Sequence, residues 1–176
     1  MDKSINDINV INVNILLDCN AFDYILEKIS LIKDLNLKFY YIWSQEIELE
    51  KISDLNKLLK IKEIKKNYTL ETAGVFMINA PCINKECFFP NSEVVNTIKR
   101  ILIKHKCLKN HRDNNFKYDL NLAITAYINK FIVLTNDGSG KKDGLLKALK
   151  EMSIKCYSTR EFEKIFLGTE GKNEIK

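Results

Sequence analysis

The residues of this chain whose types and positions could do chemistry are acidic. Asp18 and Asp137 each follow a short apolar run of the kind that forms a buried strand, and Asp119 opens an apolar helical segment. Glu48 lies in a second segment with helical periodicity. Because an unpaired carboxylate is costly to bury, carboxylates that converge on one crevice require a counter-charge. A divalent cation is the simplest one.

The position of Glu48 is predicted from the phase of its helix. Residues at i, i+4, i+7 and i+11 share one helix face, and the residues at these spacings from Glu48 are Ile52, Leu55 and Leu59. Glu46 and Glu50 fall on the opposite face. We therefore expect Glu48 to point inward, with a glutamate at the rim of the core as the alternative. Glu50 would take its place if the helix began with a distorted turn.

Each aspartate also has an ordinary structural explanation. Asp18 precedes a predicted helix and could be its N-cap. Asp119 would complement the dipole in the first turn of its helix. Asp137 stands before Gly138 in a sequence typical of turns. Asp143 is a weaker candidate, because we expect it to cap the helix that follows.

The cysteines and histidines include the residue types of a zinc site. Cys82, Cys87, His105, Cys107 and His111 are of the right types, but their spacing matches no common zinc pattern. Ordinary reduced cysteines beside a basic helix end are the favoured interpretation. We expect that replacing the cysteines leaves activity unchanged.

The charge of the chain permits nucleic-acid binding without requiring it. The sequence has 28 Lys+Arg against 23 Asp+Glu, a net charge of +5 over 176 residues. A local basic cluster could contact an RNA backbone, although a solvated helix face explains it as well. The cluster consists of Lys104, Lys106, Lys109 and Arg112.

The sequence predicts neither a membrane segment nor a secretion signal. No apolar run approaches the ~20 residues of a membrane helix, and the N-terminal residues lack a basic region followed by an apolar one. We expect a cytoplasmic protein with reduced cysteines.

Strands and helices alternate along one predicted domain, residues 12–167. A flexible N-terminal segment or short strand at 1–11 and a polar tail at 168–176 flank it. Within it, the extended segment 67–115 shows the weakest secondary-structure pattern. The expected strands are 12–17, 37–43, 131–135 and 154–157, with a further candidate at 75–78. The expected helices are 21–32, 45–59, 94–108, 118–129, 144–152 and one that a capping box opens at 158–161. This order predicts an α/β sandwich with a mainly parallel sheet, in which sites form at the carboxyl ends of strands.

Four segments resemble the motifs of PIN-domain nucleases. Residues 15–22, Ile-Leu-Leu-Asp-Cys-Asn-Ala-Phe, resemble the opening strand and its Asp-x-Asn motif. Residues 44–52 resemble the helix of the second acid, and residues 119–126 resemble that of the third. Residues 131–137 resemble the last core strand, which ends in Thr-Asn-Asp. Together the segments span nearly the whole chain in the family's order.

The resemblance implies a PIN-like three-layer sandwich and metal-dependent cleavage of RNA phosphodiester bonds. It assigns one or two Mg²⁺ or Mn²⁺ ions to Asp18, Glu48, Asp119 and Asp137, with support from Asn20, Thr135 and Asn136. Many small members are toxins of toxin–antitoxin pairs, so an antitoxin partner is expected beside the RNA substrate, and a homodimer is allowed. The long stretch 68–115 and the loop 138–142 depart from compact members, so the resemblance does not fix the substrate or the fourth acid.

Acidic residues at strand ends also occur in two other kinds of protein. A catalytically silent PIN-like domain would bind RNA or a protein partner, with its acids incidental, and metal titration would distinguish it. A receiver-type signalling domain needs adjacent acids after its first strand, whereas Asp18 is followed by Cys19. For the nuclease, we expect Asp18→Asn to abolish activity with little change in stability, and Tyr40, Tyr41 or Trp43 to be available for base stacking.

Overall fold

The computed structural model describes residues 13–32, 35–42, 45, 53–56, 58–59, 61–62, 71–73, 91–107 and 114–168. The predicted N-terminal segment and almost all of the predicted tail lie outside these ranges. Within the ranges, no helix combines the length and the apolar character needed to cross a membrane.

A five-stranded sheet forms the centre of the molecule, in the order β3-β2-β1-β4-β5, and every pair of neighbouring strands is parallel. The strands are β1 (Val13–Leu17), β2 (Leu37–Ile42), β3 (Glu71–Ala73), β4 (Ile132–Leu134) and β5 (Cys156–Tyr157). This confirms the predicted α/β class and the parallel sheet. The strand β3 was not predicted, and the candidate strand at 75–78 lies outside the described residues.

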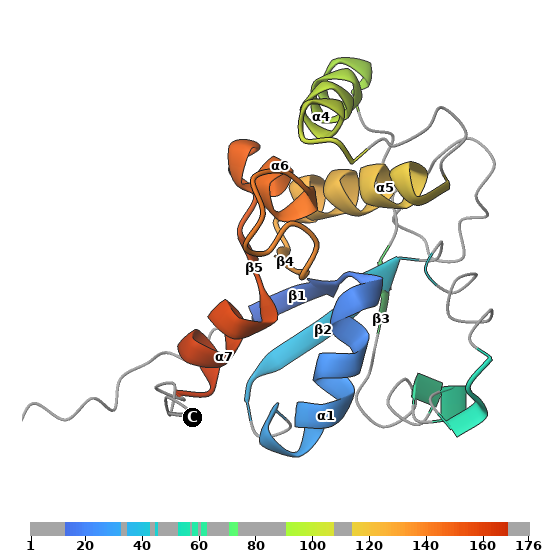
Figure 1. Cartoon of the computed structure of the whole chain (residues 1–176), viewed down its shortest axis with the longest axis vertical. Coiled ribbons are helices and arrows are strands. Elements are labelled where there is room, and N and C mark those ends of the chain that lie inside the picture. Colours follow the sequence, from blue (N-terminus) through green and yellow to red (C-terminus); the bar gives the residue numbers. More distant parts are fainter. Residues whose placement is uncertain are drawn as a thin grey trace, which may run out of the picture.

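Helices cover both faces of the sheet, so the fold has three layers (Figure 1). The helices α1 (Phe22–Ile32) and α7 (Thr159–Phe166) lie on one face, and α4 (Ser92–Lys104), α5 (Asn114–Asn129) and α6 (Leu145–Glu151) lie on the other. Side chains alternate accordingly along the strands. Leu16 packs in the core with α4, α5 and α6, whereas Ile15 and Leu17 pack in the core with α1 and α7.

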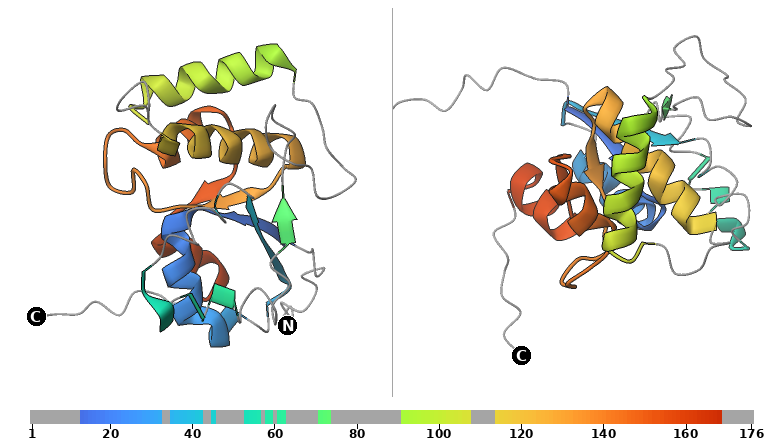
Figure 2. Two further views of the ribbon diagram at one scale, coloured as in Figure 1. Left: turned by 90° about the vertical axis from the view of Figure 1, so that its right-hand side faces the viewer. Right: turned by 90° about the horizontal axis from the view of Figure 1, so that it is seen from above.

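The direction of chain progression reverses between β1 and β4. From β1 the chain passes through α1 to β2 on one side, whereas β4 lies on the other side of β1 and leads through α6 to β5 (Figure 2). The ends of the two central strands are joined, because the Asp18 amide donates a hydrogen bond of 3.0 Å to the Leu134 carbonyl. Ligands of open α/β sheets bind in the crevice outside the strand ends at such a reversal.

Local sequence signals fix several helix ends. The Asn91 side chain caps α4 by accepting a hydrogen bond of 2.8 Å from the Glu93 amide. The predicted capping box of Ser158 and Glu161 opens α7 and is confirmed. Because Lys106 adopts a left-handed backbone with φ 58, α4 ends at Lys104 rather than continuing to 108.

The predicted helix over 45–59 is interrupted. Ser53 and Asp54 are not helical, and helical residues resume at Leu55. The Asp54 carboxylate accepts a hydrogen bond of 2.9 Å from the Asn56 amide, and the Asp54 carbonyl accepts one of 3.0 Å from the Leu58 amide. A side chain that bonds the backbone locally in this way favours the start of a new helical turn.

This interruption removes the argument that pointed Glu48 inward. Leu55 and Leu59, which were expected to share a buried stripe with Glu48, are 72% and 62% exposed. Glu48 lies outside the described residues, as do Glu46 and Glu50. The assignment of Glu48 as the second acid therefore rests on the family resemblance alone.

The helix α5 begins earlier than predicted, at Asn114 rather than at 118. Asp119 thus stands in its second turn, beyond the first turn in which the helix dipole acts most strongly. The predicted core-facing side of the helix is buried at Leu122, Ala123 and Ala126, whereas Tyr127 is 48% exposed. Leu122, Ala123 and Ala126 share one core cluster with residues of the sheet, so this side of α5 packs on the sheet.

Candidate functional site

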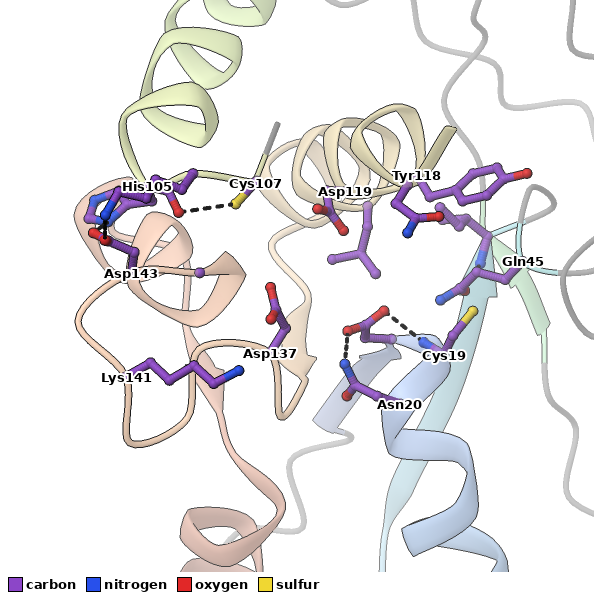
Figure 3. Close-up of a pocket in the computed structure, with 16 residues that line it drawn as sticks. Cys19, Asn20, Gln45, His105, Cys107, Tyr118, Asp119, Asp137, Lys141 and Asp143 are labelled. Atoms are coloured by element: carbon purple, nitrogen blue, oxygen red, sulfur yellow. Dashed lines mark hydrogen bonds and ion pairs between the residues drawn. The ribbon is translucent and has the colours of Figure 1, made fainter. Parts of the chain in front are cut away.

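A pocket of about 410 Å³ lies at the reversal of strand order, outside the ends of β1 and β4 (Figure 3). Its walls carry carboxylates from three separate parts of the chain: the end of β1, the helix α5 and the loop between β4 and α6. The carboxylates belong to Asp18, Asp119, Asp137 and Asp143. The cationic and titratable nitrogen groups of the lining belong to His105, Lys106 and Lys141.

Neutral hydrogen-bond donors hold Asp18 in place. Its Oδ1 accepts a hydrogen bond of 2.7 Å from the Cys19 amide, which makes Asp18 the N-cap of the short helix η1 (Cys19–Ala21). Its Oδ2 accepts bonds of 2.6 Å from Asn20 Nδ2 and of 2.6 Å from Thr135 Oγ1. The two interpretations of Asp18, N-cap and site residue, are therefore compatible. These bonds fix the carboxylate without supplying a positive charge.

The predicted supporting residues surround Asp18 and connect three elements. Asn20 Oδ1 accepts a hydrogen bond of 2.8 Å from the Asn136 amide. Thr135, which is 0% exposed, also accepts a bond of 3.1 Å from the Asp137 amide. Asn136 Oδ1 in turn accepts bonds of 3.0 and 2.9 Å from Thr159 at the start of α7. The strand ends and the next helix are thereby fixed relative to one another.

Asp137 rather than Asp143 caps α6. The N-cap residue, Gly144, has no side chain, and the Asp137 Oδ2 accepts a hydrogen bond of 2.9 Å from the Leu145 amide. The expectation that Asp143 caps this helix was wrong, because the loop folds back and brings Asp137 to the helix end. Asp143 instead lines the pocket.

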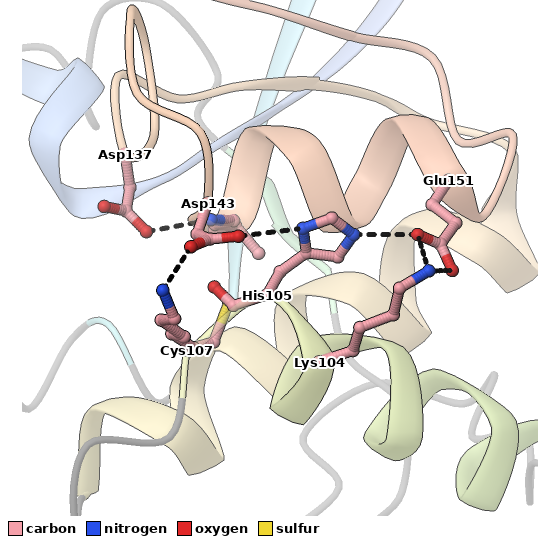
Figure 4. A network of polar contacts seen from close by, with 8 residues as sticks. Lys104, His105, Cys107, Asp137, Asp143 and Glu151 are labelled. Carbon is pink, nitrogen blue, oxygen red and sulfur yellow. Dashed lines mark hydrogen bonds and ion pairs between the residues drawn. The ribbon is translucent and has the colours of Figure 1, made fainter.

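Asp143 is paired with positive charge (Figure 4). Its Oδ2 lies 2.7 Å from Lys106 Nζ, and its Oδ1 lies 3.9 Å from His105 Nδ1. The hydrogen bond from Lys106 lowers the pKa of the Asp143 carboxyl, and the same bond raises the pKa of the Lys106 ammonium. On the other side of His105, Glu151 lies 2.8 Å from His105 Nε2 and 2.7 Å from Lys104 Nζ.

The described residues of the basic cluster at the end of α4 bind carboxylates of the protein itself. Lys104 and Lys106 each bind a carboxylate, and His105 lies between Glu151 and Asp143. Lys109 and Arg112 lie outside the described residues, as does His111. The two described lysines therefore have a structural partner that the sequence did not indicate.

Cys107 is buried beside three aspartates of the pocket. Burial raises the pKa of its thiol to about 12, and the nearby carboxylates of Asp119, Asp137 and Asp143 contribute to the increase. A thiol with this pKa is protonated at neutral pH, so Cys107 is not an activated nucleophile. Cys82 and Cys87 lie outside the described residues.

Gln45 is a site residue whose role sequence reasoning missed. It is 1% exposed, its Oε1 accepts a hydrogen bond of 2.8 Å from the Ile42 amide, and its Nε2 donates one of 2.7 Å to the Leu17 carbonyl. The side chain thereby links the ends of β1 and β2. The sequence signal for this role was the position of a polar residue just after an apolar strand.

The aromatic residues expected to stack on bases have other roles. Tyr40 stacks on Phe131, with ring centroids 4.5 Å apart, and Tyr41 is only 4% exposed. Trp43 lies outside the described residues. Tyr118 of α5 lines the pocket instead (Figure 3).

The donor types of the pocket fit a hard divalent cation. In the part of the chain that the structure describes, no three carboxylate, imidazole or thiol groups are clustered closely enough to form a metal site. The pocket nevertheless offers aspartate oxygens, and Mg²⁺ keeps several of its waters and binds through few carboxylates. Asp18, Asp119 and Asp137 supply carboxylate oxygens to this lining, whereas the Asp143 carboxylate is bound by Lys106.

Comparison with known proteins supports the fold. No family model and no curated protein matches the chain. Among solved structures, it is similar to the crystal structure of PAE2754 from Pyrobaculum aerophilum, with a TM-score of 0.50 at 13% identity. The likeness covers 91% of this chain and 99% of that one. At this identity it shows a shared fold and nothing of the chemistry.

Proposed function

We propose that this chain is a PIN-like, metal-dependent endoribonuclease. The observation that carries the proposal is the convergence of Asp18, Asp119 and Asp137 on one pocket where the strand order reverses. These residues come from segments far apart in the sequence that resemble the acid motifs of PIN-domain nucleases in the same order. Glu48 is proposed as the second acid on the resemblance alone.

In this proposal, Asp18, Asp119 and Asp137 hold one or two Mg²⁺ or Mn²⁺ ions. When bound, such an ion stabilises negative charge on phosphate oxygens and lowers the pKa of its bound water. The protein contributes a carboxylate that is oriented in advance, because Asn20 and Thr135 fix Asp18 by hydrogen bonds. Burial is the main cause of the raised pKa of the Cys107 thiol, and the additional contribution of three nearby aspartates is consistent with a negatively charged pocket.

The cellular role we propose is that of a toxin controlled by a cognate antitoxin protein. It follows from the resemblance and from the size of the chain. A catalytically silent RNA- or protein-binding module remains the rival function, and the experiment below separates the two.

The test is cleavage of single-stranded and structured RNA by the purified protein with Mg²⁺, with Mn²⁺ or with EDTA. We expect cleavage only with metal. Asp119→Asn should reduce the rate by ~10²–10³, the usual loss when an electrostatic group of a site is removed. The matched control is Asp23→Asn, an exposed aspartate in the first turn of α1 and outside the pocket, which should keep the wild-type rate.

Three results would count against the proposal. Cleavage that survives EDTA would exclude the metal mechanism. An Asp119→Asn variant as fast as wild type would show that the pocket is not the active site. RNA binding by wild type without cleavage in either metal would favour the silent module.

A further inference from the structure

The loop between β4 and α6 is closed at its base by two glycines. Gly138 and Gly144 have φ of 80 and 125, and a Cβ on Gly144 would lie 2.6 Å from the Gly138 Cα. No other residue type fits such an approach. Inside the loop, the Ser139 amide donates to the Asn136 carbonyl at 3.0 Å, and the Lys141 amide donates to the Gly138 carbonyl at 3.1 Å. These turns define the course of the loop.

The loop is also anchored to the end of α4 (Figure 4). The Gly144 amide donates a hydrogen bond of 3.0 Å to the His105 carbonyl. Asp143 is held at 2.7 Å by Lys106. A loop closed by glycines and tied at its end to a helix holds the residue at its tip in one region of space.

That residue is Lys141, and its side chain extends into the pocket toward Asp137 (Figure 3). Among the described residues, no carboxylate lies within ion-pair distance of Lys141. The other lining lysine, Lys106, is bound to Asp143. Lys141 is therefore the lysine of the described lining whose positive charge is not matched inside the protein.

A pocket lined by aspartates repels the phosphates of a nucleic acid. A lysine at its edge offsets this repulsion and can donate a charge-assisted hydrogen bond to a phosphate oxygen. Resting on the proposed function, we propose that Lys141 is a substrate-binding residue that contacts a phosphate of the RNA at the mouth of the pocket. The unusual loop from Gly138 to Lys142 then has a role in recognising the substrate.

Three variants test the proposal in cleavage of a single-stranded RNA oligonucleotide with Mn²⁺. Lys141→Gln should lower kcat/KM by about 10- to 100-fold, the range for a lost hydrogen bond to a charged group. Lys141→Arg should recover most of the activity, because it keeps the charge. The matched control is Lys142→Gln, which changes the adjacent exposed lysine outside the pocket lining and should stay within about 2-fold of wild type.

A binding measurement separates this proposal from the proposed function. In the Asp119→Asn background, the affinity for the same oligonucleotide is measured by fluorescence anisotropy at several salt concentrations. Removing one phosphate contact should reduce the slope of log K against log salt by about 0.7 for Lys141→Gln. Lys142→Gln should leave the slope unchanged. If wild type cleaves no RNA, the nuclease proposal fails while this slope still decides the role of Lys141.

Several outcomes would overturn the role of Lys141. Equal losses for Lys141→Gln and Lys142→Gln would indicate a general charge effect of the loop. A Lys141→Arg variant as defective as Lys141→Gln would indicate a role of shape rather than charge. An unchanged salt slope, or no measurable RNA binding by wild type, would exclude the phosphate contact.

Discussion

The two sides of the pocket hold their aspartates by different means. Asp18 is fixed by the Cys19 amide, Asn20 and Thr135, which are neutral donors. Asp143 is fixed by the ammonium group of Lys106. Both carboxylates are held by hydrogen bonds, and at Asp143 the donor is a lysine ammonium group that also carries positive charge. The Asp143 side anchors the loop to the end of α4, and we propose that the Asp18 side takes part in binding a cation.

The largest effect is expected for Asp18→Asn. We expect a loss of activity of ~10²–10³ and also a loss of stability, which corrects our expectation from the sequence. Both Asp18 oxygens accept hydrogen bonds. In asparagine, an NH2 group replaces one of these oxygens, so a donor would face a donor. An unmet bond of this kind costs about 1–3 kcal/mol. Urea denaturation measures the change, and an unfolding free energy equal to that of wild type would contradict the hydrogen-bond pattern.

A smaller effect is expected for Thr135→Val, which keeps the shape of the side chain and removes its hydroxyl. Asp18 Oδ2 would lose one donor and the Asp137 amide would lose its acceptor. We expect a destabilisation of about 1–2 kcal/mol, because Thr135 is fully buried. Thr97→Val on the exposed face of α4 serves as the control and should unfold like wild type. Similar stability of the two variants would show that Thr135 does not support the site.

The smallest effect is expected on the Asp143 side, and it depends on pH. Since Lys106 lowers the pKa of Asp143 from its ordinary 3.8, the pair stabilises the folded protein above that pH and loses its effect as Asp143 becomes protonated. Lys106→Gln should therefore lower the Tm slightly near neutral pH, and the difference should shrink below about pH 4. Lys99→Gln, an exposed lysine of the same helix, should show no such pH dependence. A Tm difference that grows on acidification would refute the pairing.

The parts of the fold that could be predicted from the sequence are those fixed by neighbouring residues. The strand before Asp18 is short and apolar, and the capping box of Ser158 and Glu161 opens α7 as expected. The end of a strand also indicated where Asp18 and Asp137 would lie, because parallel strands bring their carboxyl ends to one edge.

The parts that could not be predicted depend on contacts between distant segments or on local competition. Lys106 meets Asp143 only because the loop after β4 folds against the end of α4. The apolar period over 45–59 indicated one helix, but the Asp54 side chain bonds the backbone there and favours the start of a new turn. Tyr40 was expected to be available to a ligand, whereas it packs on Phe131.

The most direct test of the account is Mn²⁺ binding measured by isothermal titration calorimetry. Wild type is compared with Asp119→Asn and with Asp143→Asn. Each substitution removes one carboxylate from the same pocket. If the pocket binds a cation through Asp18, Asp119 and Asp137, Asp119→Asn should weaken binding at least ~10-fold. Asp143→Asn should stay within about 3-fold of wild type, because the Asp143 carboxylate is already bound by Lys106. No Mn²⁺ binding by wild type, or equal losses in the two variants, would contradict the account.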